Sequence, residues 1–188
     1  MDGGAVGKSG TIEKNINLEI AKKLKAYIEE GGDVCIMIRE VDEGLYSQLN
    51  TLETKKRQDL KKRKDIINEY KADAFVSIHL NSFPQAQYYG AQVFYPKGDK
   101  DSELFAKIVQ EELIKILNRN NKRIEKGTDD YYIIKNNNIP SILVECGFLS
   151  NPEEEKLLND PNYQNKIAWA LYYGIMKYFA TYKNDTHQ

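Results

Sequence analysis

Two hydrophobic periods alternate along the 188 residues of this chain. Apolar residues that recur every three or four positions predict amphipathic helices, and short apolar or alternating runs predict strands. Helices are predicted in residues 16–28, 54–70, 104–116 and 163–182, and strands in residues 34–38, 74–78, 90–95, 131–134 and 142–144. This alternation predicts an α/β fold: a single domain whose largely parallel, twisted sheet carries helices on both faces.

The residues at the helix ends predict where the helices begin. Ser9 or Thr11 can cap the first helix, because a hydroxyl oxygen accepts a hydrogen bond from a free backbone N–H of the first turn. Asp101 or Ser102 can cap the third long helix in the same way. Pro152 suits the first turn of a further short helix, where its missing N–H costs nothing.

Two of the predicted strands end in an ionisable residue. The run DAFVSIHLNS at 73–82 reaches His79, and the run SILVECGF at 141–148 reaches Glu145. In open α/β sheets the chemistry gathers outside the carboxyl ends of the strands. A carboxylate buried after an apolar run is costly unless it is paired, protonated or bound to metal, and neutral imidazole is a common zinc ligand. His79 and Glu145 are therefore predicted to share a reaction centre, although a histidine at a strand end is often only hydrogen-bonded structure.

Glu13 is ambiguous from local sequence alone. It falls in the first turn of a predicted helix, where an acidic side chain is favoured by the helix macrodipole without any further function.

Composition and charge argue against two classes of protein, general nucleic-acid binders and proteins with a membrane-spanning helix. Lys and Arg number 27 against 28 Asp and Glu, for a net charge of -1, which argues against a general nucleic-acid binder. No apolar run approaches the length of a membrane span, and the first residues do not resemble a signal peptide. Residues 54–70 are densely charged, which indicates either a solvated amphipathic helix or a local basic face for an anionic polymer.

Both cysteines, Cys35 and Cys146, lie in or beside apolar runs and are predicted to be small buried side chains. A sharper hypothesis makes Cys146 a nucleophile beside His79. Nothing in the sequence would lower the pKa of its thiol, as such a role requires.

Three short motifs together resemble the zinc-dependent N-acetylmuramoyl-L-alanine amidases. They are GTIEKN at 10–15, SIHLNS at 77–82 and LVECGFLSNP at 143–152, and the resemblance runs in order to about Phe179. In detail the chain resembles most closely the germination-specific, spore-cortex branch, through DGGAVG at 2–7 and GAQVFY at 90–95. Any one motif alone would be weak evidence, and the three in order are specific.

The resemblance implies a zinc hydrolase. Glu13 and His79 would be Zn²⁺ ligands, and Glu145 would be the catalytic carboxylate that takes a proton from the attacking water. The substrate would be peptidoglycan (a muropeptide), cut at the amide between N-acetylmuramic acid and L-alanine. The resemblance also implies an exported protein of the cell wall or spore envelope and leaves room for an activating partner protein of unknown identity.

One feature departs from the family. The family has a further histidine ligand in a His-Gly-Gly turn after an opening strand, and this chain begins with Met1-Asp-Gly-Gly, downstream of that turn. The other histidine, His187, lies in a polar tail. The expectation is thus an N-terminally truncated, amidase-like catalytic domain at 1–182 with impaired activity and a frayed tail at 183–188. The alternative is an inactive amidase-like module that binds peptidoglycan or a partner protein.

Three further polar residues, Arg39, Asn81 and Arg63, can hold either the site or the glycan.

Overall fold

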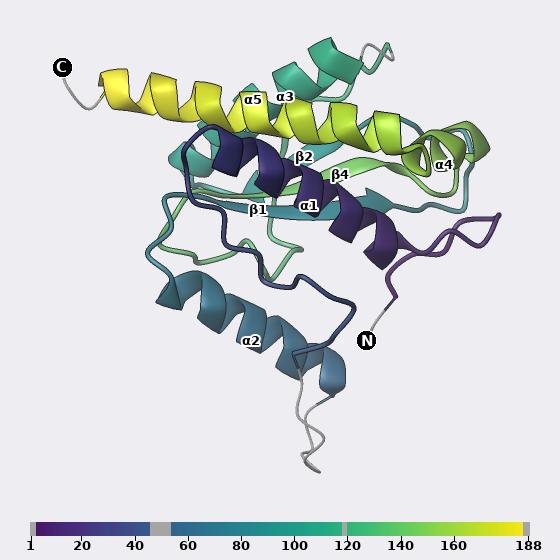
Figure 1. The fold of residues 1–188 in the computed structure, drawn as a ribbon, viewed down its shortest axis with the longest axis horizontal. Coiled ribbons are helices and arrows are strands. Elements are labelled where there is room, and N and C mark those ends of the chain that lie inside the picture. The colour runs from purple at the N-terminus through teal and green to yellow at the C-terminus, as the bar shows by residue number, and fades with distance from the viewer. Residues whose placement is uncertain (1–2, 46–53, 118–119, 186–188) are drawn as a thin grey trace.

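The computed structural model of the protein describes residues 3–45, 54–117 and 120–185, with residues 182–185 described by their backbone alone (Figure 1). In chain order its elements are α1 (Glu13–Glu30), α2 (Lys55–Glu69), β1 (Phe75–Asn81), β2 (Gln92–Pro96), α3 (Lys100–Leu117), β3 (Lys126–Thr128), β4 (Ser141–Phe148), α4 (Pro152–Leu158) and α5 (Pro161–Asp185). Within the described residues these elements form one α/β domain, as the hydrophobic pattern predicts.

The four strands form one sheet in the order β1-β4-β2-β3. β1 pairs with β4 and β2 with β3 in parallel, while β2 and β4 pair antiparallel. Two of the three pairings are therefore parallel, and the predicted fold class is confirmed. Every residue of β4 is buried, as expected of an apolar strand that is covered on both faces. β1 lies at the edge of the sheet, and of its residues only Leu80 is fully buried.

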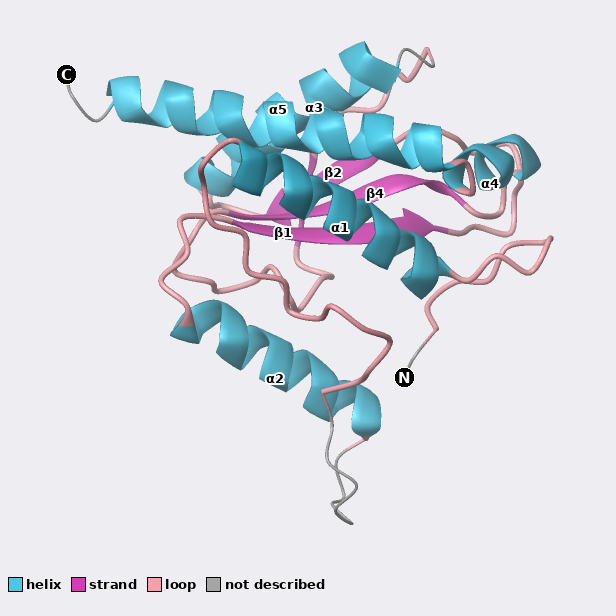
Figure 2. Ribbon diagram, in the orientation of Figure 1, coloured by secondary structure: helices cyan, strands magenta, loops and turns pink. Residues whose placement is uncertain are grey.

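Helices cover the two faces of the sheet unequally (Figure 2). On one face α1, α3 and α5 pack over the sheet and enclose the main core, which includes Ile20, Phe105, Val144 and Leu171. On the opposite face lies α2, whose Ile67 belongs to a smaller cluster. The other buried members of this cluster are Phe94, Ile133, Ile134 and Leu143. No helix within the described ranges combines the length and apolar character that crossing a bilayer requires.

Two of the strand predictions are wrong. Residues 34–38 form no strand, and Val34 is 87% exposed. A short apolar run becomes a strand only when another strand pairs with it, and no strand of the described chain pairs with residues 34–38. Residues 131–134 form a turn, and Ile134 is fully buried in the smaller cluster. The apolar pattern of residues 131–134 therefore reflects the burial of their side chains and not an extended backbone. The short strand β3 was not predicted.

The predicted caps of the first helix are also wrong. α1 has Ile12 at its N-cap position, and no side chain caps it. The preceding loop folds back on itself through a bridge between Val6 and Ile12, which directs Ser9 away from the helix start. Instead the Ser9 hydroxyl donates a 2.5 Å hydrogen bond to Glu155 Oε1.

Two other helix starts give mixed outcomes. At α3 the carboxylate of Asp99 accepts bonds from the backbone N–H and the hydroxyl of Ser102, so neither predicted residue is the acceptor. At α4, Pro152 occupies the first turn as predicted, behind an Asn151 cap. The predicted frayed tail is not tested in full: α5 continues to Asp185, and 186–188 lie outside the described residues.

Candidate active site

Glu13 and His79 lie 66 residues apart in sequence and are in contact in the fold. α1 presents Glu13 from its first turn, and β1 presents His79 near its carboxyl end. Because α1 packs on β1, Glu13 Oε1 and His79 Nδ1 approach to 3.0 Å. The Glu13 residue is 8% exposed, so the pair is largely shielded from water on the side of the carboxylate.

The Glu13 carboxylate is held by hydrogen bonds from several elements. The backbone N–H of Ala5 donates to Oε2 at 2.7 Å, while Asn17 Nδ2 at 3.1 Å and the Leu80 N–H at 3.3 Å donate to Oε1. Burial by itself raises the pKa of Glu13, but the bonds from His79, Ala5 and Asn17 outweigh it and hold the pKa below its ordinary value. The carboxylate is therefore anionic and oriented at neutral pH.

The other ring nitrogen of His79 also has a partner. Nε2 lies 3.0 Å from the Ser77 hydroxyl, and the His79 side chain is 40% exposed. Hydrogen bonds at both nitrogens orient the ring with one nitrogen toward Glu13.

Glu145 lies beside His79 on the neighbouring strand. The two residues are register partners in the parallel β1–β4 pair, so their side chains leave the same face of the sheet. Glu145 is 7% exposed, and its Oε2 has no hydrogen-bond partner in the described chain. Burial raises the pKa of Glu145 to about 7, and the nearby Glu13 charge adds to that effect. A carboxyl group with a pKa near 7 is suited to accept and release a proton.

Tyr131 is a site residue that sequence reasoning did not find. Its hydroxyl donates to Glu145 Oε1 at 3.4 Å, and burial together with the Glu145 charge raises the pKa of the phenol to about 12. The turn at 131–134 brings the ring to the site, where it packs edge-on against Phe94 at 5.3 Å. No local signal in the sequence marks Tyr131 as a site residue. Its contact with Glu145 depends on a turn that the apolar pattern predicted to be a strand.

The thiol hypothesis finds no support in the geometry. Cys146 follows Glu145 in β4, so its side chain leaves the opposite face, where it is 1% exposed within the main core. Burial raises the pKa of its thiol, which disfavours the thiolate. The predicted burial of Cys146 is confirmed, while Cys35 is only partly buried, and both cysteines are free.

The three unranked polar residues make other bonds. Arg39 Nη2 donates to the Lys14 carbonyl at 2.5 Å, and Arg63 pairs with Asp59 at 2.5 Å. Asn81 Oδ1 accepts from the Ser82 N–H. None of these bonds reaches Glu13, His79 or Glu145.

The donor types at the site suit zinc, which accepts imidazole nitrogen and carboxylate oxygen. Glu13 and His79 already turn their donor atoms toward one another. The described residues contain no cluster of three histidine, cysteine, aspartate or glutamate side chains placed to hold a metal ion. His187 lies outside the described residues. The described chain therefore supplies two fitting ligands, whereas a catalytic zinc site normally has three protein ligands.

The family model for N-acetylmuramoyl-L-alanine amidases (Amidase_3) matches residues 1–177. The chain belongs to this amidase family. The family recognised from the three motifs and the class of enzyme are thereby confirmed. A germination-specific N-acetylmuramoyl-L-alanine amidase of Bacillus subtilis is 40% identical over 185 residues, which cover 98% of this chain and 77% of the relative.

Solved structures agree with this assignment. The CwlD amidase of Clostridioides difficile, solved in complex with the GerS lipoprotein, superposes with a TM-score of 0.92 at 51% identity, over 95% of this chain and 92% of that one. An N-acetylmuramoyl-L-alanine amidase of Clostridium difficile 630 gives a TM-score of 0.83 at 28% identity, over 95% and 90% of the two chains.

Proposed function

We propose that this protein is a zinc-dependent amidase that hydrolyses the bond between N-acetylmuramic acid and L-alanine in peptidoglycan. One observation carries the proposal. The zinc-compatible pair Glu13 and His79 lies beside Glu145, a buried carboxyl group whose pKa is raised, where β1 pairs with β4. Family membership supports the class of bond, since the family is described by this activity.

In this proposal Glu13 and His79 hold the ion through Oε and ring nitrogen atoms. Bound zinc would polarise the scissile carbonyl and lower the pKa of a water molecule. The bonds from Ala5, Asn17 and Leu80 keep Glu13 oriented, and they limit the reorganisation that ion binding requires.

Glu145 is proposed to move the proton. Its unpartnered Oε2 accepts a proton from the attacking water and passes it to the leaving amine of L-alanine. Tyr131 holds Oε1, so that Oε2 remains directed at the reactants. A pKa near 7 lets the same carboxyl group serve in both steps.

The biological setting is proposed from the relatives. The B. subtilis relative is named a germination-specific amidase, and the C. difficile structure is a complex with a lipoprotein. We infer action outside the cytoplasm, on the cell wall or spore cortex, with an activating protein partner of the same general kind.

A second candidate function is a binding module that holds peptidoglycan without cutting it. This candidate is motivated by the two zinc-compatible ligands, Glu13 and His79, that the described residues bring together where a catalytic zinc site normally has three. A site with only two of the usual three ligands also leads to a modified version of the first proposal. In this version the protein is an amidase that binds zinc substoichiometrically and has low activity.

The test combines zinc titration with a cleavage assay. After dialysis against a chelator, calorimetry measures Zn²⁺ affinity in the wild type, Glu13→Gln and the control Glu19→Gln, a half-exposed glutamate on the same helix. The proposal expects Glu13→Gln to lower affinity about tenfold or more, and Glu19→Gln to leave it unchanged. Mass spectrometry of digested muropeptides then distinguishes an enzyme, which releases free stem peptides, from a binder, which does not. Zinc affinity that is equal in all three proteins would refute the ligand assignment.

A further inference from the structure

The segment that holds Glu13 from the N-terminal side is a small hairpin, here called the N-terminal loop (residues 3–12). Val6 and Ile12 form an antiparallel bridge across it, and this bridge lies outside the strands of the described sheet. An isolated two-stranded hairpin is marginally stable at best in water. The N-terminal loop therefore depends on contacts with other elements to keep one conformation.

One arm of the N-terminal loop caps the first turn of α1. The Glu13 N–H donates to the Ala5 carbonyl at 3.0 Å, and the Lys14 N–H donates to the Gly3 carbonyl at 3.2 Å. These carbonyls satisfy backbone donors that a side-chain cap would otherwise serve. The Ala5 N–H in turn donates to Glu13 Oε2 at 2.7 Å. The loop backbone thus fixes both the start of the helix and the orientation of the carboxylate.

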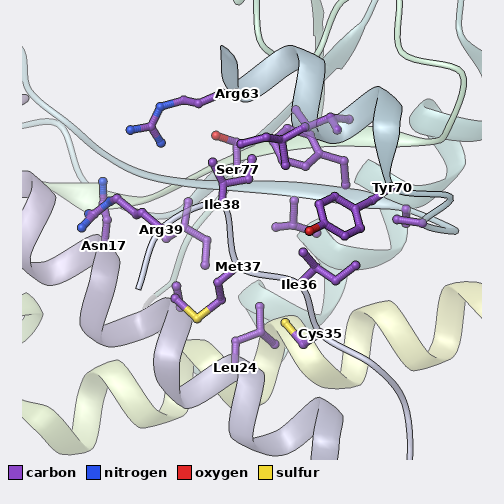
Figure 3. Close-up of a pocket in the computed structure, with 18 of the residues that line it drawn as sticks. Asn17, Leu24, Cys35, Ile36, Met37, Ile38, Arg39, Arg63, Tyr70 and Ser77 are labelled. Atoms are coloured by element: carbon purple, nitrogen blue, oxygen red, sulfur yellow. The ribbon is translucent and has the colours of Figure 1, made fainter. Parts of the chain in front are cut away.

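The Glu13 carboxylate needs this support because it is not closely packed on every side. Glu13 lines a cavity of about 1300 Å³, and Gly3 and Gly4 of the N-terminal loop line it too. Figure 3 shows Asn17, which donates to Glu13 Oε1, among the residues that line this cavity. Atoms that border a cavity lack contact neighbours on that side. Hydrogen bonds, rather than close packing, therefore hold the carboxylate on its cavity side.

Glu155 of α4 anchors the tip of the N-terminal loop. The Ser9 hydroxyl donates to Glu155 Oε1 at 2.5 Å, and the Ser9 N–H donates to the same oxygen at 3.0 Å. Glu155 is 3% exposed, and a Cβ atom built on Gly7 would lie 2.1 Å from its Oε1. The carboxylate therefore lies directly against the loop backbone, where a glycine leaves room for it. Asn159, at the end of α4, adds a 2.7 Å bond from Nδ2 to Thr11 Oγ1.

The preceding residue of α4, Glu154, braces a different part of the fold. Glu154 is 2% exposed, and it accepts hydrogen bonds from the N–H of Gly90 at 2.9 Å and the N–H of Phe148 at 2.8 Å. Two adjacent buried carboxylates thus hold two different segments. Glu154 holds the end of β4 and the residues before β2, whereas Glu155 holds the N-terminal loop. This difference makes Glu154 a matched control for Glu155.

We propose that Glu155 is a positioning residue for Glu13. By fixing the tip of the N-terminal loop, it keeps the Ala5 N–H on the Glu13 carboxylate, and it acts through the loop rather than on the reactants. Without the Glu155 carboxylate the loop tip is freed, the bond from Ala5 to Glu13 opens more often, and zinc meets a less ordered ligand. The effect on zinc rests on the proposed function, whereas the effect on the Ala5 amide does not.

Amide hydrogen exchange in the metal-free protein tests the positioning directly. The quantity to measure is the exchange rate of the Ala5 amide divided by that of the Leu24 amide, which lies in the interior of α1. Glu155→Ala should raise this ratio about tenfold or more, because a charge-assisted anchor of the loop is lost. Glu154→Ala should leave the ratio unchanged. A ratio that stays at the wild-type value in Glu155→Ala, or rises equally in both variants, would overturn the proposal.

Zinc titration by calorimetry gives a second readout. Glu155→Ala should lower zinc affinity about threefold or more, and Glu154→Ala should not. Glu155→Gln should recover most of the affinity, because its amide oxygen can still accept from Ser9. Ser9→Ala should have a smaller effect, since the Ser9 N–H bond remains, and no further effect in the Glu155→Ala background. These two milder variants keep the test decisive if Glu155→Ala fails to fold, which circular dichroism checks.

The two readouts separate this inference from the proposed function. If Glu13→Gln weakens zinc binding but the Glu155 variants leave zinc affinity and Ala5 exchange unchanged, the positioning role is refuted and the proposed function stands. If Glu13→Gln leaves zinc binding unchanged, the ligand assignment fails. Faster Ala5 exchange in Glu155→Ala would then still support the positioning of the Glu13 carboxylate by Glu155.

Discussion

The Glu13 carboxylate occupies the space where a side chain at position 4 would begin. A Cβ atom built on Gly4 would lie 2.3 Å from Glu13 Oε2, and Gly4 has a φ of +70°. This glycine lets the loop backbone approach the carboxylate closely enough for the Ala5 N–H to donate its 2.7 Å bond. The geometry of the proposed zinc ligand thus depends on a residue that carries no functional group.

Gly4→Ala is therefore expected to displace the Glu13 carboxylate. The predicted result is a fall of about tenfold or more in zinc affinity, measured by calorimetry, because the ligand loses its orienting bond. Gly10→Ala is the matched control: Gly10 also has positive φ, at +89°, but an added Cβ meets nothing within 4 Å. Both variants bear the backbone strain, and only Gly4→Ala bears the clash. An equal effect of the two substitutions would exclude the carboxylate contact as the cause.

Glu145→Gln should separate catalysis from metal binding. The amide keeps the shape of the side chain but cannot accept the proton of the attacking water, so muropeptide cleavage should fall by about 10²-fold or more. Zinc affinity should remain within about threefold of wild type, because Glu145 is not a proposed ligand. A variant that cleaves at the wild-type rate would remove Glu145 from its catalytic role, and one that loses zinc would make it a ligand.

The buried Glu145 carboxyl also predicts how stability depends on pH in the metal-free protein. Its pKa is raised from 4.5 to about 7 in the folded state, so between these values the folded protein binds more protons than the unfolded chain. The free energy of unfolding should therefore fall as pH rises from about 5 to 8, by at most about 3 kcal/mol from this group. Urea unfolding at several pH values, with a chelator present, measures it. Subtracting the Glu145→Gln profile isolates the contribution, and parallel profiles would contradict the prediction.

Tyr131→Phe tests the hydrogen bond to Glu145. Burial raises the pKa of Glu145, and the Tyr131 hydroxyl lowers it in part by stabilising the carboxylate. Removing the hydroxyl should raise the pKa of Glu145 and so shift the acidic limb of the pH–activity profile to higher pH, by up to about 1 pH unit. The ring should keep its packing on Phe94. Tyr132→Phe, at a half-exposed neighbouring position, is the control. A lower activity with an unchanged pH profile would assign Tyr131 a purely structural role.

Cys146→Ser distinguishes a zinc-dependent amidase from a thiol hydrolase that uses Cys146 as its nucleophile. The thiol packs in the main core, so the substitution should cost about 1 to 3 kcal/mol of stability through a buried hydroxyl, measured by urea unfolding. Cleavage by the folded fraction should be unchanged, and chelators should abolish it in both proteins. Loss of cleavage in folded Cys146→Ser, with chelators harmless, would restore the thiol hypothesis.

Local sequence was sufficient for the elements whose periodicity is strong. The apolar runs that reach His79 and Glu145 lie in β1 and β4, although these strands continue to Asn81 and Phe148, and the helical stripes correspond to α1, α2, α3 and α5. The three motifs were also sufficient for the family, because family membership is a property of residues in order rather than of contacts. The carboxyl-end rule predicted that His79 and Glu145 share one site, and the two residues are register partners on the paired strands β1 and β4.

Contacts between distant segments were decided only by the tertiary structure. Glu13 was ambiguous in sequence because its surroundings, Ala5, Asn17 and His79, come from a loop, a helix and a strand. Tyr131 reaches Glu145 through a turn whose apolar pattern predicted a strand. Residues 34–38 have the pattern of a strand but no strand of the described chain beside them. A pattern reports which side chains avoid water, whereas pairing and site geometry depend on which segments the fold brings together.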